Sequence, residues 1–163
     1  MVSFDDGIVS EVLALGQALR LRGWRLATAE SCTGGLIAAA CTSVAGSSDW
    51  FERGFVTYSN RSKTELLGVE AALIATEGAV SEAVARAMAA GALARAPVQL
   101  TLAVTGVAGP GGGSKDKPVG TVWLALARGD GVQAERLQLG GDRAAVRSRT
   151  VQQALARLRA AVA

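Results

Sequence analysis

The sequence contains no histidine, and only two of its 163 residues are cysteine. Histidine is the commonest base for a serine or cysteine nucleophile, so any such nucleophile here must use another base. Cys32 and Cys41 lie nine residues apart, and at about 100° per residue a helix would place them on opposite faces. They therefore predict no disulfide and, without histidine, no structural zinc site.

Aromatic residues make up only 4% of the chain, and its basic residues are scattered. Proteins that bind nucleic acid usually gather cations and stacking aromatics on one surface. No apolar run approaches the ~18 residues of a membrane span. The first six residues are acidic where a signal peptide would be basic. We therefore expect a cytoplasmic protein that binds neither nucleic acid nor membranes.

Alanine is abundant instead, which suits closely packed helices, and we expect residues 1–163 to form a single domain. Helical spacing, caps and stops predict helices at 5–22, from the turn after Ser31 to about 43, and at 60–67, 71–75, 81–96 and 142–163, with Asn60, Ser81 and Asp142 as N-caps. Strand patterns cover 25–30, 52–58, 98–105, 121–127 and 132–139. This order predicts an α/β fold, a three-layer α/β/α sandwich with a mixed, mostly parallel sheet.

Ser31 falls where the first strand passes into an alanine-rich helix. Free N–H groups and about half a unit of positive charge at a helix N-terminus favour a nucleophile and its oxyanion. The alternative is that Ser31 caps the helix, and Cys32 and Thr33 are rival nucleophiles or caps. Gly34 and Gly35 favour a ligand at this turn, because each costs about 1 kcal/mol against alanine but allows close approach to the backbone.

Lys63 is one of only three lysines beside fourteen arginines. In its helix it shares the apolar face of Leu66 and Leu67. An inward-pointing lysine either extends its amine to solvent or loses its proton more easily through desolvation. Beside a cleft, a neutral Lys63 is the leading candidate for the base of Ser31.

Tyr58 and Thr105 each end a strand, at the edge of the sheet where sites of α/β proteins lie. Tyr58 is either a core or rim aromatic, a hydrogen-bond partner of the nucleophile, or a stacking surface for a ring. Thr105 either satisfies a backbone group or contacts substrate.

The loop at 106–113 carries five glycines and one proline, in the style of a phosphate-binding loop. It is not a Walker A motif, because Ser114 precedes Lys115 where that motif requires glycine. Arg147 lies on the apolar stripe of the last helix and needs a partner. A substrate phosphate or a carboxylate such as Glu30 or Glu52 would supply one, and Arg143 is a weaker candidate for the phosphate.

Four separated segments resemble the CinA C-terminal domain family, in order and over essentially the whole chain. They are AESCTGG at 29–35, YSNRSK at 58–63 with LLGV at 66–69, TGVAGP at 105–110, and GDR at 141–143 with VR at 146–147. The resemblance implies a nicotinamide-nucleotide amidohydrolase of pyridine-nucleotide salvage, which converts nicotinamide mononucleotide and water to nicotinate mononucleotide and ammonia.

The resemblance further implies that Ser31 is the nucleophile and Lys63 its partner, with Tyr58 steadying the pair. The substrate contacts that we expect are backbone N–H groups of Thr33, Gly34 and Gly35 at the oxyanion, Thr105 in the cleft, and Gly106, Gly109 and Arg147 at the 5′-phosphate. No metal or cofactor is required, and we expect a homodimer. Three other functions stay open: a nucleotide-binding regulatory domain without catalysis, a competence or DNA-damage interaction module, and an amidase acting on another nucleotide.

Overall fold

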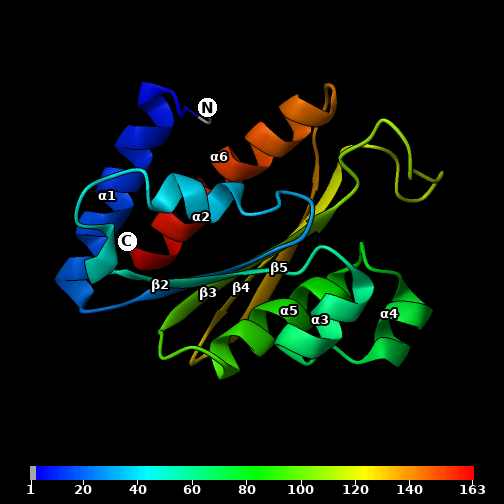
Figure 1. Cartoon of the computed structure of the whole chain (residues 1–163), viewed down its shortest axis with the longest axis horizontal. Helices are drawn as coiled ribbons and strands as arrows, with labels where there is room; N and C mark the ends of the chain where they lie inside the picture. Colours follow the sequence, from blue (N-terminus) through cyan, green and yellow to red (C-terminus); the bar gives the residue numbers. More distant parts are fainter. Residues whose placement is uncertain (1–2) are drawn as a thin grey trace.

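A computed structural model describes residues 3–163, and it places a five-stranded sheet between two layers of helices (Figure 1). The strands are β1 (Leu26–Glu30), β2 (Phe51–Val56), β3 (Leu100–Gly106), β4 (Thr121–Arg128) and β5 (Gly131–Gln138), in the spatial order β2-β1-β3-β4-β5. β1 pairs in parallel with β2 and β3, whereas β4 is antiparallel to both β3 and β5. Four of the five strands thus run in one direction, and the expected mixed sheet is confirmed.

The helices divide between the two faces of the sheet (Figure 1). One face carries α1 (Asp6–Arg22), α2 (Leu36–Cys41) and α6 (Arg143–Val162), and the other carries α3 (Asn60–Leu67), α4 (Ala71–Glu77) and α5 (Glu82–Ala94). The expected three-layer sandwich is therefore confirmed. Within the described part of the chain, none of these helices is both long and apolar enough to cross a bilayer.

The alternation of side chains along β3 explains the two cores. Leu100, Leu102 and Val104 belong to the core under α1 and α6, whereas Ala103 belongs to the core under α5. The side of the sheet that faces α5 also presents Ala29, Ala125 and Ala127. Small side chains on both partners let the alanine-rich α5 lie close to the sheet.

Caps and stops define the helix ends much as the sequence predicts. Ser81 and Asp142 cap α5 and α6 by accepting hydrogen bonds from N–H groups three residues on. The cap of α3 is Ser59, which accepts from the N–H of Ser62, so the prediction that Asn60 caps this helix is wrong. Gly68 ends α3 in the left-handed conformation that glycine adopts at little cost.

The three parallel strands end at one edge of the sheet, as Glu30 lies in register with Val56 on β2 and Val104 on β3. The segment after each strand therefore begins at the same place. The turn at 31–35, the segment at 57–63 and the loop from 106 meet there, as expected for an α/β sheet. The N-terminal end of α6 joins them, because Arg143 hydrogen-bonds to Tyr58 and to the carbonyl of Gly109.

Candidate active site

Ser31 and Lys63 meet at this edge although 32 positions separate them in the chain. The Nζ of Lys63 donates a hydrogen bond to Ser31 Oγ at 3.0 Å and a second to the carbonyl oxygen of Thr57 at 2.9 Å. Both side chains are buried, and Lys63 is only 1% exposed. A hydroxyl and an amine within hydrogen-bonding reach have the geometry that a nucleophile and its base require.

Lys63 points inward because α3 packs against α5 through the face that also carries Leu67. Leu66 lies on the exposed side of α3, so it does not share the face of Lys63 as predicted. Burial disfavours the ammonium form and lowers the pKa of Lys63 from its ordinary value, while the neighbouring Cys32 acts weakly in the opposite direction. The surroundings thus favour the neutral amine that a base requires.

The turn after Ser31 differs from the expected helix start. The helix α2 begins only at Leu36, and Gly35 occupies the N-cap position. The carboxylate of Glu30 accepts hydrogen bonds from the N–H groups of Ile37 at 2.8 Å and Ala38 at 2.9 Å. The prediction of an open helix terminus beside Ser31 is therefore wrong, and so is the alternative that Ser31 caps α2.

The predicted contacts in this turn lie beside the cleft without lining it. The Thr33 hydroxyl is buried and donates to Glu30 Oε1 at 2.6 Å. The N–H of Gly34 donates to the carbonyl of Ser31 at 3.0 Å. Gly34 and Gly35 have φ angles of 59° and 99°, which glycine adopts without strain. The two glycines are thus explained by the course of the turn itself.

Cys32 borders the cleft directly. Burial raises the pKa of its thiol to about 11, opposed by the nearby backbone N–H. The thiolate is the nucleophilic form of cysteine, so Cys32 is a poor rival to Ser31 near neutral pH.

The cleft at Ser31 has a volume of about 260 Å³. Residues from five separate segments line it: Ser31, Cys32, Tyr58, Asn60, Lys63, Ala79, Val80, Thr105, Gly106, Ala108 and Arg143. Ala79 and Val80 come from the loop before α5 and carry no chemical signal in the sequence, so nothing in their pattern could have marked them. Within residues 3–163, no group of three or more histidine, cysteine, aspartate or glutamate side chains could hold a metal ion.

Thr105 and Tyr58 both line the cleft, and each has a hydrogen-bond partner within the protein. Thr105 Oγ1 donates to the carbonyl of Ala79 at 2.9 Å and so satisfies a backbone group. Tyr58 is 60% exposed, and its hydroxyl accepts a hydrogen bond from Arg143 at 2.9 Å. Tyr58 therefore does not bond to the nucleophile, contrary to expectation, and it lines the cleft as an exposed residue.

Arg147 contacts neither of the carboxylates considered for it. Its Nε donates to the carbonyl of Cys32 at 3.2 Å, and its Nη2 donates to the carbonyl of Thr33 at 3.0 Å. Glu52 instead pairs with Arg25 and Arg53. The guanidinium of Arg147 thus supports the turn that carries Ser31.

A second cleft of about 650 Å³ adjoins the first and shares Ala108 and Arg143 with it. Its lining includes the start of α6: Ala108, Pro110, Val119, Gly141, Asp142, Arg143, Ala144 and Arg147. Arg143 stands between the two clefts and donates to the carbonyl of Gly109 at 3.0 Å. The weaker sequence candidate, Arg143, is therefore the arginine that borders Ser31's cleft.

The glycines of the 106–113 loop are explained in part by packing. A Cβ on Gly106 would lie 2.7 Å from a methyl of Val122, and one on Gly109 would lie 2.5 Å from Val119. These distances are too short for any other residue without a shift of its neighbours. Gly106 borders the Ser31 cleft, whereas Gly109 contributes its carbonyl to Arg143.

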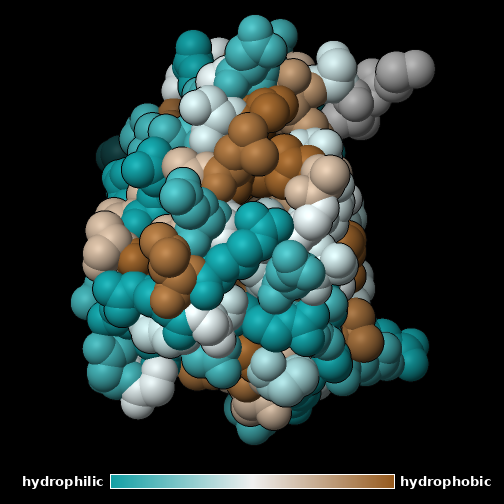
Figure 2. Space-filling view, turned by 90° about the vertical axis from the view of Figure 1, so that its left-hand side faces the viewer, coloured by the Kyte–Doolittle hydropathy of each residue, from teal (hydrophilic) through white to brown (hydrophobic). Residues whose placement is uncertain are grey.

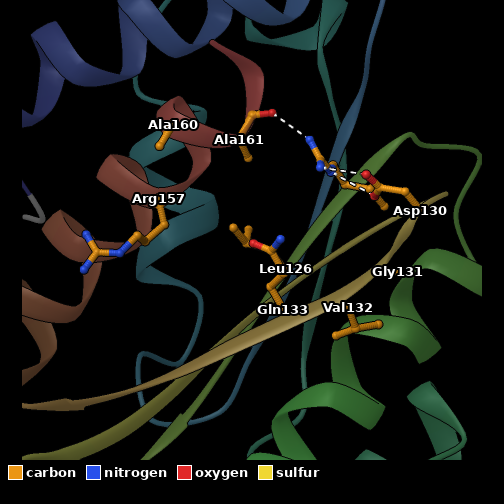
Figure 3. Close-up of a pocket in the computed structure, with 9 residues that line it drawn as sticks. Leu126, Asp130, Gly131, Val132, Gln133, Arg157, Ala160 and Ala161 are labelled. Atoms are coloured by element: carbon orange, nitrogen blue, oxygen red, sulfur yellow. Dashed lines mark hydrogen bonds and ion pairs between the residues drawn. The ribbon is translucent and has the colours of Figure 1, made fainter.

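A further cavity of about 380 Å³ lies at the opposite end of the sheet, between the β4–β5 turn and the end of α6 (Figure 3). Arg128 there is paired with Asp130 and donates to the carbonyl of Ala161. Arg157 pairs with Glu135 and points away from Gln133 in Figure 3. Because its arginines are already engaged and it holds no nucleophile, this cavity is not the candidate active site.

Comparison with known proteins identifies the family of this chain. The CinA C-terminal domain model matches residues 10–162. The chain is 54% identical over 150 residues to the nicotinamide-nucleotide amidohydrolase PncC of Pseudomonas putida, covering 92% of this chain and 94% of the relative. It is 55% identical over 134 residues to the protein of the same name from Enterobacter agglomerans, covering 82% of each. The crystal structure of the competence/damage inducible protein CihA from Agrobacterium tumefaciens superposes with a TM-score of 0.95 at 44% identity, covering 99% of each chain.

Proposed function

This chain belongs to the CinA C-terminal domain family, and we propose that it is a nicotinamide-nucleotide amidohydrolase. The reaction converts nicotinamide mononucleotide and water to nicotinate mononucleotide and ammonia. Curated relatives at more than 50% identity carry that activity in their names. The observation that carries the proposal is the 3.0 Å hydrogen bond between Lys63 and Ser31 in a cleft.

In the first step, Ser31 Oγ attacks the carboxamide carbon of the substrate, and neutral Lys63 takes the hydroxyl proton. Loss of the ammonium proton reverses the hydrogen bond, so that Ser31 donates and the Lys63 lone pair accepts. The remaining N–H bonds of Lys63 can still donate to the carbonyl of Thr57, which holds the amine in place. Burial lowers the pKa of Lys63 and so makes the neutral form accessible.

The oxyanion needs N–H donors that have no other acceptor. Within residues 3–163, the backbone N–H groups of Cys32, Thr33 and Gly35 donate to no backbone carbonyl, whereas the Gly34 N–H is used inside the turn. Of these groups, the N–H groups of Cys32 and Thr33 are the donors that we propose, because Cys32 borders the cleft and Thr33 follows it directly in the turn. One such donor is typically worth about 3 kcal/mol in the transition state.

In the second half, Lys63 returns the proton to the leaving nitrogen, and ammonia departs as the acyl-enzyme forms. Water then attacks the acyl carbon, again losing a proton to Lys63, and the bond to Ser31 breaks with return of that proton to Oγ. The scheme assigns no step to a metal or cofactor.

For substrate binding, we place the nicotinamide ring beside Tyr58 and Thr105 in the cleft at Ser31. The 5′-phosphate lies in the adjoining cleft, between Arg143 and Arg147 and beside the loop that contains Gly106 and Gly109. Two guanidinium groups suit a phosphate dianion. The acidic side chain there, Asp142, is already engaged as the cap of α6.

Ammonia release from nicotinamide mononucleotide by purified Ser31→Ala and Lys63→Met variants tests this proposal. Either variant should lose activity by several orders of magnitude, on the order of 10⁶-fold in well-studied serine enzymes. Ser31 caps no helix, so the midpoint of thermal unfolding of Ser31→Ala should stay near that of the parent. Lys115→Met, which changes an exposed lysine, is the matched control and should keep full activity. Near-parental turnover by Lys63→Met would show that Lys63 is not the base of Ser31.

A nucleotide-binding domain without catalysis is the alternative function, because the same clefts could hold a ligand. It predicts that nicotinamide mononucleotide raises the unfolding temperature while no ammonia appears. The Ser31–Lys63 contact favours the enzyme, since binding alone needs no buried amine beside a hydroxyl. Parallel assays with the free amide and the dinucleotide separate this reading from an amidase with another substrate.

We propose further that the chain is a single domain and acts as a cytoplasmic homodimer that binds no nucleic acid. Figure 2 shows apolar residues gathered on the face that carries α1. The exposed large hydrophobics of the described residues are Leu13 and Leu21 of α1, together with Val56, Tyr58 and Leu66. Light scattering after gel filtration should give twice the chain mass of 16.6 kDa. The monomer mass would contradict the dimer.

A further inference from the structure

Glu30 is a buried carboxylate that the proposed chemistry does not use. It ends β1 immediately before Ser31, and it is 1% exposed. Of the charged side chains in residues 3–163, only Glu30 and Lys63 are buried. A charge removed from water costs free energy unless it is paired or fully hydrogen-bonded, so its surroundings call for an explanation.

Three donors surround the carboxylate, and no cation pairs with it in the described residues. Oε1 accepts from the Thr33 hydroxyl at 2.6 Å and from the N–H of Ile37 at 2.8 Å. Oε2 accepts from the N–H of Ala38 at 2.9 Å. Each oxygen therefore binds a backbone N–H, and only a carboxylate, which accepts at both atoms, fits this arrangement.

These hydrogen bonds connect the residues on both sides of the 31–35 turn with the middle of the turn. Glu30 precedes the turn, Thr33 lies at its middle, and Ile37 and Ala38 follow it in α2. The Arg147 guanidinium holds the same turn through the carbonyls of Cys32 and Thr33. Two consecutive glycines make this turn flexible in isolation, so its fixed course in the protein depends on such contacts.

We propose that Glu30 is a positioning residue, which holds the 31–35 turn so that Ser31 Oγ stays against Lys63 and the N–H groups of Cys32 and Thr33 face the reacting carbonyl. This inference rests on the proposed amidohydrolase function. Thr33 acts with Glu30, because its hydroxyl links the carboxylate to the middle of the turn. The competing explanation is that Glu30 only stabilises the start of α2.

Glu30→Gln is the direct test. Either orientation of the amide would turn its NH₂ group toward a backbone N–H, of Ile37 or of Ala38, and so displace the turn. A displacement of about 1 Å in an active site can cost about 10²-fold in rate. We expect kcat for nicotinamide mononucleotide to fall by about that factor, with KM within about twofold of the parent and the midpoint of the pH–rate profile unchanged.

Thr33→Val and Thr33→Ser form a matched pair, which keeps the test decisive where Glu30→Gln fails to fold. Valine has the shape of threonine without the hydroxyl, and serine keeps the hydroxyl without the methyl group. Loss of kcat in Thr33→Val with recovery in Thr33→Ser supports positioning. Folded variants that keep parental kcat and lose only thermal stability show that Glu30 and Thr33 merely stabilise α2, which overturns the proposal.

The rate at which a fluorophosphonate probe labels Ser31 separates this proposal from the proposed function. Labelling needs an aligned serine and lysine but no nicotinamide substrate. A parent protein that is labelled without releasing ammonia refutes the proposed substrate, and slower labelling of Thr33→Val than of Thr33→Ser still supports positioning. Equal labelling of parent and both variants, or no labelling of the parent at Ser31, overturns the positioning role.

Discussion

At the residue scale, the site depends on one lysine that is held away from solvent. Lys63 Nζ donates hydrogen bonds to the hydroxyl of Ser31 and to the carbonyl of Thr57. The pairing was predictable because lysine is scarce here and Lys63 follows a strand end on the inner side of a helix. The hydrogen bond between the Tyr58 hydroxyl and Arg143 was not predictable, since the two residues are 85 positions apart.

The buried amine predicts a rising pH–rate profile. Below the folded-state pKa of Lys63 the ammonium cannot accept a proton from Ser31, and above it the amine is free to do so. Since burial lowers this pKa from its ordinary value of 10.5, kcat/KM should rise with pH and reach its plateau below the range of a free lysine. Initial rates from neutral pH upward give the profile, and a flat or falling one is incompatible with a lysine base.

The same shift predicts how stability changes with pH. Between the folded and the unfolded pKa of Lys63 the unfolded chain binds more protons, so the free energy of unfolding rises with pH there. Urea unfolding of parent and Lys63→Met across this interval isolates the contribution. Parallel curves for the two proteins would show that Lys63 keeps an ordinary pKa.

At the element scale, α3 delivers Lys63, and its position depends on a close contact with α5. A Cβ on Gly91 of α5 would lie 2.0 Å from the carbonyl oxygen of Leu67, the last residue of α3. Helix propensity alone favours alanine over glycine by about 1 kcal/mol. At this position the contact outweighs the propensity, because the backbone of α3 would have to move.

Gly91→Ala should therefore destabilise the protein by about 1–3 kcal/mol and lower kcat, because α3 and its lysine are displaced. Urea unfolding and ammonia release measure the two effects. The control is Ala90→Gly at the exposed neighbouring position, which should lose about 1 kcal/mol of stability and keep kcat. A Gly91→Ala variant as stable as the parent would contradict the close contact of the two helices.

At the scale of the whole molecule, one sheet links the two helical layers. Trp50 is buried in the core under α1 and α6, and Trp123 packs against the core under α5. Both cores use the same strands, with alternate side chains on opposite faces. We therefore expect the two layers to unfold together.

Two double variants each replace Trp24 and one other tryptophan. One variant then keeps Trp50 alone and the other keeps Trp123 alone, so each has a fluorescent reporter in one layer. Fluorescence of Trp50 and of Trp123 should then give the same denaturation midpoint as far-UV circular dichroism of the same variant. The double variants control for each other, since each carries the probe that the other lacks. Separate midpoints within one variant would mean that the layers unfold independently, and that the chain is not a single cooperative domain.

Local patterns in the chain were sufficient for the order of helices and strands and for the edge of the sheet that holds the site. The scarcity of lysine in a chain without histidine singled out Lys63 as the partner of Ser31. Caps, helical spacing and alternation act over a few residues, so they can be recognised without a structure. The contacts of Arg147 with Cys32 and of Arg143 with Tyr58 span 115 and 85 positions. Such partners are set by the packing of α6 against the turn, which no local pattern records. The carboxylate of Glu30 belongs with them, because it caps α2 only once β1 and the turn have brought it beneath that helix.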